Sequence, residues 1–342
     1  MSQKQTFPDY PLAELHAHLG TSIRPSVLWE IAHQMGYKLP KRDFNEFRDY
    51  ITLSPERKVA LNTYFREIYH PVLDKLSSGS HAVEFATYHT MTGAYRNQGI
   101  TLMELRNGPL RHNRDGEFDL DQVIMSMLRG MERALLECRG LNAGLIFCML
   151  RDLTYEQNVV TLEKAIKYHR RGVVGIDLAG PGNADFNFKD YTDVFKRAKK
   201  AGLKVTVHSG EQQDADDMWE ALECADPLRI GHGIRAAYDK PLMKELAKRK
   251  TVLEVCPLSN VATKAVENMD ELKFILRTFI ENDVRFCINT DWPETIENNG
   301  LRQQYAFLLE QGMLSEEELE VCTRTAFEAS FIPKGGGLDA YL

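Results

Sequence analysis

The sequence has no long apolar run and no pair of closely spaced cysteines. No stretch of its 342 residues approaches the roughly 18 consecutive apolar residues that a membrane-spanning helix needs. Its six cysteines are widely spaced and form no CxxC pair, which excludes a zinc ribbon and a dithiol redox site. Residues 1–11 lack the apolar segment of a secretory signal. These absences predict a cytoplasmic protein that has no membrane partner.

The chain also has fewer positively than negatively charged residues. Lysine and arginine number 42 against 49 aspartates and glutamates, a formal charge of −7. A surface that binds nucleic acid needs clustered positive charge. The HxE…PCxxC zinc signature of nucleic-acid deaminases is absent as well. We therefore expect no nucleic-acid partner, whereas a small neutral or cationic substrate is compatible with this composition.

The chain alternates short apolar runs, which end in polar residues, with longer helical patterns. No low-complexity linker divides it, so we expect a single domain over residues 1–342. This alternation predicts a parallel sheet, and eight strands predict a closed (β/α)8 TIM barrel. A doubly wound open sheet is the alternative, but no GxGxxG loop follows the first strand. The predicted strands are Leu12–Leu19, Ile100–Asn107, Ala143–Leu150, Val173–Gly180, Lys204–His208, Leu228–His232, Thr251–Cys256 and Val284–Thr290.

Two stretches fall outside this alternation. Residues from about 21 to 98 read as a mostly helical, aromatic-rich insertion after the first strand, where it could serve as a lid. Ser315–Phe331 begins with the capping signature Ser-Glu-Glu-Glu and is predicted to be a helix that ends before Pro333. Helical spacing of apolar residues also predicts helices over Phe188–Ala201 and Glu271–Ile280.

Histidine and aspartate gather where the predicted strands end. His16 and His18 are two residues apart on the first strand, so their side chains share a face. His208 and Asp291 come at the ends of the fifth and eighth strands, and strand ends form the active face of such a barrel. Three imidazoles and one carboxylate suit Zn²⁺ or another first-row divalent ion, with a position left for water. An HxH pair alone is equally compatible with hydrogen-bonded barrel residues; the matching positions of His208 and Asp291 favour ligands.

Two more polar residues accompany this predicted metal site. Glu211 follows His208 by three residues and is expected in the first turn of a helix, where it could act as a general acid or base. The alternative is a carboxylate that merely interacts with the helix dipole. His232 ends the sixth strand between two glycines, where it could orient a water at the metal. A structural histidine at a tight turn is the other interpretation.

Six short motifs together resemble the adenosine deaminase family of the amidohydrolase superfamily. They appear in the order and spacing of that family, and the likeness runs from about Leu12 to Pro333. It implies a zinc-dependent hydrolytic deaminase of an adenosine-like nucleoside or a related aminated purine-type heterocycle, which releases ammonia. The motifs are Glu-Leu-His-Ala-His-Leu, Gly-Ile-Asp-Leu-Ala-Gly, Val-His-Ser-Gly-Glu, Arg-Ile-Gly-His-Gly, Cys-Pro-Leu-Ser-Asn and Asn-Thr-Asp-Trp-Pro.

The resemblance also implies roles for individual residues. Glu211 would handle the proton at the purine ring nitrogen beside the amino-bearing carbon, and His232 would assist the attacking hydroxide. Gly180 would offer its backbone amide to the far ring nitrogen. No lysine ends the fourth strand to bridge a second ion, which favours one Zn²⁺. The ligands would be His16, His18, His208 and Asp291, with Asp291 also in the catalytic group and His18 also contacting the substrate.

Two substrate-reading positions depart from the family pattern. Gly20 stands where the family has an aspartate near the ribose 5′-hydroxyl, a loss that we expect to open space. Trp292 stands where a second aspartate contacts the purine; an indole removes that acceptor and adds a flat apolar surface. We therefore expect a 5′-modified adenosine or another purine-like amine rather than adenosine. The alternative is that Trp292 stacks in the core and adenosine binds through other groups.

Two other functions remain open to the sequence. One is a metal-dependent hydrolase that cleaves a different amine or a cyclic amide or ester. The other is a non-catalytic nucleoside-binding relative, which should have lost a ligand or the proton-handling glutamate; His208, Glu211 and Asp291 are all present. The sequence carries no signal for the oligomeric state.

Overall fold

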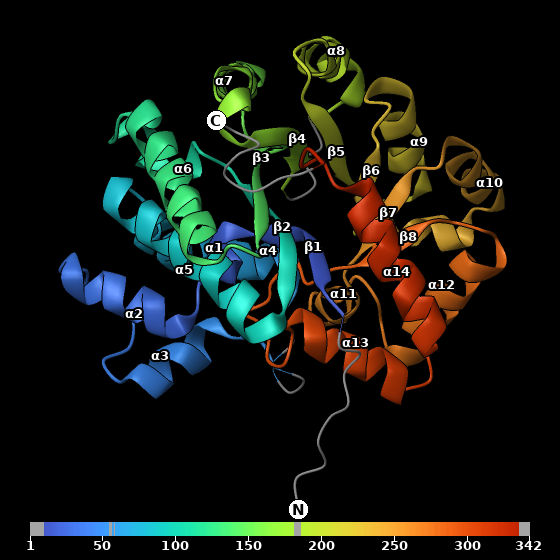
Figure 1. Ribbon diagram of the computed structural model, residues 1–342, viewed down its shortest axis with the longest axis horizontal. Coiled ribbons are helices and arrows are strands. Elements are labelled where there is room, and N and C mark those ends of the chain that lie inside the picture. Colours follow the sequence, from blue (N-terminus) through green and yellow to red (C-terminus); the bar gives the residue numbers. More distant parts are fainter. Residues whose placement is uncertain (1–9, 55–56, 58, 181–185, 335–342) are drawn as a thin grey trace, which may run out of the picture.

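A computed structural model describes residues 10–54, 57, 59–180 and 186–334 of the chain. Its eight strands are parallel and follow one another in chain order around a barrel (Figure 1). Backbone hydrogen bonds join the two ends of the sheet, since Asp291 N donates to His16 O at 2.7 Å and His18 N donates to Asp291 O at 3.2 Å. The TIM barrel predicted from the alternating pattern is confirmed. The strands are β1 (Leu12–His18), β2 (Ile100–Asn107), β3 (Asn142–Leu150), β4 (Val173–Ala179), β5 (Lys204–Ser209), β6 (Arg229–His232), β7 (Val252–Val255) and β8 (Phe286–Ile288).

Helices surround the strands (Figure 1). The helix predicted over Phe188–Ala201 is a short 3-10 turn followed by α8, and the one predicted to start at Ser315 has the expected capping box. Among the described residues, no helix has the length and apolarity to cross a bilayer. The α-helices are α1 (Leu19–Ser22), α2 (Pro25–Gln34), α3 (Phe44–Ile51), α4 (Leu61–Tyr64), α5 (Ser80–Gln98), α6 (Leu120–Glu137), α7 (Tyr155–Lys167), α8 (Thr192–Lys200), α9 (Ala215–Cys224), α10 (Lys240–Arg249), α11 (Pro257–Ala262), α12 (Met269–Glu281), α13 (Leu301–Glu310) and α14 (Glu316–Ala329); the others are the π-helix η1 (Phe65–Asp74) and the 3-10 helices η2 (Arg111–Gly116), η3 (His169–Arg171), η4 (Phe188–Tyr191) and η5 (Ile234–Tyr238).

The helical segment after β1 confirms the expected insertion in the barrel pattern. It contains α1 to α4, the π-helix η1 and α5. Helix α5 packs along α6, as a helix between β1 and β2 should, while α2 and α3 project to one side (Figure 1). Leu61 of α4 and four residues of η1, Phe65, Tyr69, His70 and Asp74, line the cavity at the strand ends. This part of the insertion therefore contributes directly to the wall of the site.

The barrel interior holds a layer of ion pairs in addition to the apolar side chains that usually fill it. Arg106 and Arg229 are fully buried. Arg106 Nη1 lies 2.8 Å from Asp177 Oδ2, and its Nη2 also contacts Glu254. Arg229 pairs with Glu254 at 2.6 Å and with Glu104 at 2.5 Å. Because each charge has partners of opposite sign, this layer ties β2, β4, β6 and β7 together beneath the strand ends.

The chain after α14 closes the opposite end of the barrel. The ring of Phe331 lies 3.5 Å from the guanidinium carbon of Arg229, and Ser330 Oγ donates to Glu104 at 2.7 Å. Gly175 on β4 leaves the room for this ring, since a Cβ there would lie 2.8 Å from Phe331. The charged layer is thus sealed from water on this side.

Candidate metal centre and active site

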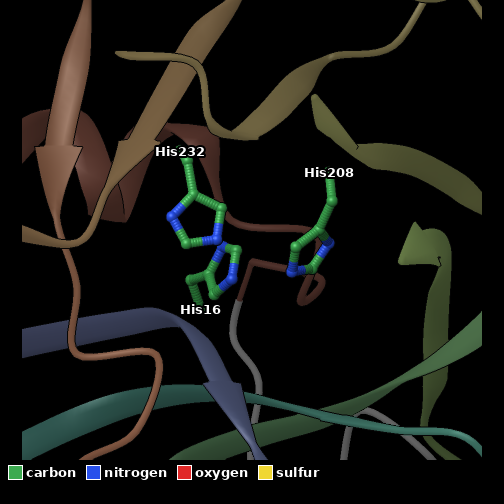
Figure 2. A group of neighbouring side chains, drawn as sticks. All are labelled: His16, His208 and His232. Atoms are coloured by element: carbon green, nitrogen blue, oxygen red, sulfur yellow. The ribbon is translucent and has the colours of Figure 1, made fainter. Parts of the chain in front are cut away.

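Three histidines from different strands turn toward one point at the strand ends. Figure 2 shows His16, His208 and His232 facing one another, from β1, β5 and β6. The centroid of the His16 ring lies 4.5 Å from that of His208 and 4.7 Å from that of His232. His18, the second histidine of β1, brings its Nε2 to 3.0 Å from Nε2 of His208. The predicted strand-end histidines are therefore assembled in one cluster.

Asp291 supplies a carboxylate to this cluster. Its Oδ1 lies 3.6 Å from His16 Nε2 and 3.5 Å from His18 Nε2. Its Oδ2 accepts a hydrogen bond from Ser259 Oγ at 2.7 Å, which leaves Oδ1 facing the histidines. The backbone of Asp291 is left-handed, with φ of 60°, a strained conformation that is held by the surrounding contacts.

The donor set fits a divalent cation. His16 Nδ1 is bound to Glu254 at 2.8 Å, and its buried Nε2 has no hydrogen-bond partner among the described residues. Burial and then the positive charges nearby hold the pKa values of His16 and His18 well below the usual range, so both imidazoles are neutral and can offer lone pairs. An unpartnered buried nitrogen among neutral imidazoles and a carboxylate is what a bound cation would satisfy.

Two buried carboxylates hold the histidines from behind. Glu254 on β7 binds Nδ1 of His16, and Asp177 on β4 lies 2.9 Å from Nδ1 of His208. Burial alone would raise the pKa of Asp177, but His208 and Arg106 hold it below the usual range. Such partners fix the ring orientation and raise the basicity of metal-ligating histidines. Sequence reasoning missed both residues, although a charge inside an apolar strand, as in Ile-Asp-Leu and Leu-Glu-Val, was a usable signal.

Glu211 lies beside the cluster, but not in a helix. The expectation that it occupies the first turn of a helix was wrong, because it lies in the bend between β5 and α9. Its Oε2 is 3.7 Å from His232 Nε2, and Oε1 is 3.5 Å from the hydroxyl of Thr263. Burial, and then the negative charge of Asp291, raises the pKa of Glu211 to about 8. The carboxyl group therefore carries a proton at neutral pH and can donate it.

His232 has the geometry of a hydrogen-bond donor toward the site. Its Nδ1 accepts from Asn260 Nδ2 at 2.9 Å, so the ring proton is on Nε2, which faces Glu211. Burial lowers the pKa of His232 well below its usual range. Like Asp291, it has a left-handed backbone, with φ of 61°. A neutral imidazole that presents an N–H can hold an oxygen of a reacting group.

The cluster opens into a cavity with about 790 Å³ free of protein atoms, which is large enough for a nucleoside-sized molecule. Gly180 lines this cavity with φ of 93°, a conformation that favours glycine. Gly20 and Trp292, the other predicted substrate-binding residues, line it too. All of the predicted site residues therefore come together at one place.

The contacts of Gly20 and Trp292 differ from what the sequence led us to expect of this cavity. Loss of a carboxylate at Gly20 does not open space, because a Cβ there would lie 2.7 Å from the hydroxyl of Tyr69. Trp292 is 3% exposed and packs against Tyr64, with ring centroids 4.7 Å apart, and against Phe65 at 6.0 Å. Its indole both packs against the insertion and lines the cavity, so the two alternatives for Trp292 are not exclusive.

The candidate site is a cluster of histidines and a carboxylate at the strand ends of a TIM barrel, and comparison with known proteins identifies the family. The adenosine deaminase family model matches residues 11–338. An adenosine deaminase of Shewanella denitrificans is 29% identical over 322 residues, with 94% of each chain covered. An adenine deaminase of Hahella chejuensis is 31% identical over 327 residues, which covers 94% of this chain and 92% of the relative.

Solved structures agree on the fold. The adenine deaminase of Arthrobacter aurescens has a TM-score of 0.82 at 24% identity, with 95% of each chain covered. The N6-methyl-AMP deaminase of Arabidopsis thaliana has a TM-score of 0.76 at 23% identity, over 95% of this chain and 93% of that one. This chain belongs to the adenosine deaminase family. It is accordingly a hydrolytic deaminase, and the resemblance found in its motifs is confirmed.

Proposed function

We propose that this enzyme uses one Zn²⁺ to remove ammonia from an adenine-type heterocycle, with a small molecule as its substrate. One observation carries the proposal: the unpartnered Nε2 of His16 lies among neutral imidazoles and the carboxylate of Asp291, beside the protonated Glu211. A cytoplasmic location remains a prediction from the sequence.

The ligands in this proposal are His16, His18, His208 and Asp291, whose side chains converge at the ends of β1, β5 and β8. Imidazole nitrogens with one carboxylate oxygen suit Zn²⁺, although another first-row divalent ion would fit the same donors. When bound, the ion lowers the pKa of a water so that it can attack near neutral pH. Glu254 and Asp177 keep the two histidines that they contact oriented toward the ion.

The remaining steps belong to the protein's own groups. The oxygen of a water adds to the amino-bearing carbon while Glu211 gives its proton to the adjacent ring nitrogen, which neutralises the negative charge that develops on the ring. The Glu211 carboxylate then takes up one proton of that water. His232 donates its Nε2 proton in a hydrogen bond to the attacking oxygen. Gly180 offers its backbone N–H to the ring nitrogen on the far side. The proton of the added hydroxyl passes to the amino group, the carbon–nitrogen bond breaks with release of ammonia, and the ring carbon retains the oxygen as a carbonyl.

Ammonia release by the zinc-loaded protein tests this proposal. The panel comprises adenine, adenosine, 5′-substituted and 5′-phosphorylated adenosines, guanine, cytosine derivatives and aminopteridines. We expect turnover of adenine-type compounds, and we expect plain adenosine not to be the best of them because Trp292 offers no carboxylate to the purine. No ammonia from any compound, with zinc bound, would contradict the proposal and favour hydrolysis of another bond. Best turnover of plain adenosine would contradict only the argument from Trp292.

A further inference from the structure

His208 and Glu211 stand at the two ends of a four-residue segment. This segment finishes β5 and bends toward α9, so its backbone sets the distance between the proposed metal ligand and the proposed acid. The carbonyl groups of Ser209 and Gly210, in its middle, each accept a backbone N–H from the chain that follows β6, at 3.0 Å. Backbone hydrogen bonds therefore hold the segment on the β6 side.

On the other side, the carbonyl of His208 is bound by a side chain. Arg151, directly after β3, donates from Nη2 to His208 O at 2.9 Å. In the part of the chain that the structure describes, pairing between β4 and β5 stops at Ile176 and Val205, so the later residues of β5 pair with no residue of β4. Arg151 reaches across this opening and satisfies a buried carbonyl that the sheet leaves without a partner strand.

Asp217 fixes the guanidinium of Arg151. Its Oδ1 lies 2.7 Å from Nη1 and its Oδ2 lies 3.0 Å from Nη2, a two-pronged contact that sets both the position and the plane of the group. The Arg151 side chain is 4% exposed, and its guanidinium carbon lies 4.7 Å from the ring of Phe186 and 5.0 Å from that of Phe188. With partners on several sides, the guanidinium is a rigid support for the His208 carbonyl.

Ser209 joins the same carboxylate to the segment directly. Its buried hydroxyl donates to Oδ2 of Asp217, which is in the first turn of α9. The next residue of the segment, Gly210, has φ of 66° and packs so closely against Met218 of the same helix that a Cβ would not fit. One network therefore ties the segment to β3 and to α9.

Arg151 is not positioned to contact the substrate. It is not among the described residues that line the cavity, although the next residue, Asp152, is. Its influence on the reaction therefore passes through the main chain of His208. Such support matters, because a displacement of about 1 Å in a reacting group can lower a rate by about 100-fold.

We propose that Arg151, Asp217 and Ser209 form a clamp that holds the segment from His208 to Glu211, so that the proposed ligand and the proposed acid keep their relative positions. Arg151 is a positioning residue in this clamp, since it acts through the His208 carbonyl. The inference rests on the proposed deaminase function and extends it to residues outside the cavity.

Arg151→Met and Asp217→Asn test the clamp. We expect each variant to bind zinc but to have a kcat lowered by about 10- to 100-fold, with KM within about threefold of wild type, because the substrate contacts remain. Co²⁺ suits the same donors, and its absorption bands should differ from those of the wild type because the His208 ring is displaced. Ammonia release from the best substrate of the panel, metal analysis and the spectra of the Co²⁺-loaded proteins measure these effects.

Arg285→Met is the matched control. Arg285 pairs with Glu328 at 2.6 Å directly before β8, at the opposite end of the barrel, so this variant should keep the wild-type kcat and Co²⁺ spectrum. Ser209→Ala is a milder test that leaves the ion pair of Arg151 and Asp217 in place. It removes one hydrogen bond from the clamp and should lower kcat by about three- to tenfold.

A wild-type kcat and Co²⁺ spectrum in Arg151→Met and Asp217→Asn would overturn the clamp. A loss of activity that only matches the fraction of unfolded protein would overturn it too, as would a rise in KM alone, which would place Arg151 at the substrate. The wild-type protein separates the two proposals. Ammonia from the wild type with unaffected variants rejects the clamp alone, whereas no ammonia from the wild type rejects the deaminase and leaves the Co²⁺ spectra to decide on the clamp.

Discussion

Glu211 and Asp291 are buried carboxyl groups of one site that their surroundings equip for different tasks. Ser259 donates to Asp291, and two imidazole nitrogens lie within 3.6 Å of its free oxygen. Burial raises the pKa of Asp291 to about 6, while that of Glu211 reaches about 8. When two neighbouring carboxyl groups have different pKa values, the one with the lower pKa stays charged and the one with the higher pKa can carry a proton. The proposed ligand and the proposed acid are distinguished in this way.

The Glu211→Gln substitution should lower the turnover rate without changing the zinc content. The amide keeps the shape of the side chain but cannot give up a proton, so kcat should fall by a factor of about 10² to 10⁴. Zinc content should stay at the wild-type value, because Glu211 is not among the proposed ligands. Steady-state kinetics together with metal analysis checks this prediction. Near-normal kcat would remove Glu211 from the mechanism, whereas lost zinc would make it a ligand.

The positions of the barrel strands could be predicted from the sequence, whereas the ion pairs between them could not. Their apolar residues were enough to predict all eight strands to within a few residues, because alternation of short and long apolar patterns is local. The ion pairs inside the barrel were not predicted. Arg229 meets Glu104 and Glu254 across 125 and 25 residues of sequence, so their pairing depends on the closed barrel.

This layer leads to a prediction about stability. Arg229→Met should lower the free energy of unfolding by about 3–5 kcal/mol, because Glu104 and part of Glu254 lose a buried counter-ion. Arg197→Met is the matched control, since Arg197 pairs with Glu163 at the surface and should cost at most about 1 kcal/mol. Urea denaturation measures both variants. An equal loss of unfolding free energy in the two variants would mean that the interior ion pairs stabilise the fold no more than a surface ion pair does.

The π-helical conformation within the insertion could not be predicted from the apolar pattern. Its helical character was predicted, yet η1 is a π-helix, and nothing in the apolar spacing of residues 65–74 indicates a five-residue repeat. Pro71 inside it lacks an N–H, which removes one backbone hydrogen bond and favours a departure from the regular α-helix. Whether the chain then widens its turns depends on what it packs against, here Trp292 and the strand ends.

For the whole molecule, metal removal should lower thermal stability. The proposed ligands come from β1, β5 and the segment after β8, so one ion would join both ends of the sheet. With free zinc at about 100 times its dissociation constant, binding adds about 2.7 kcal/mol, which corresponds to several degrees in Tm. A chelator should remove this gain and added zinc should restore it. The His16→Ala variant serves as the control, and its Tm should not respond; a chelator without effect on the wild type would count against the site.

The sequence by itself determined the barrel and the set of residues at its active face. Apolar periodicity is local, and the barrel topology places every strand's carboxyl end at one face, so His16, His208, Glu211, His232 and Asp291 could be assigned there before any contact was known. Only the tertiary structure decided how these groups are tuned. Glu254 and Asp177 behind the histidines, Asn260 on His232, and Tyr69 above Gly20 are contacts between distant segments. They depend on packing distances of a few ångströms, which no spacing along the chain encodes.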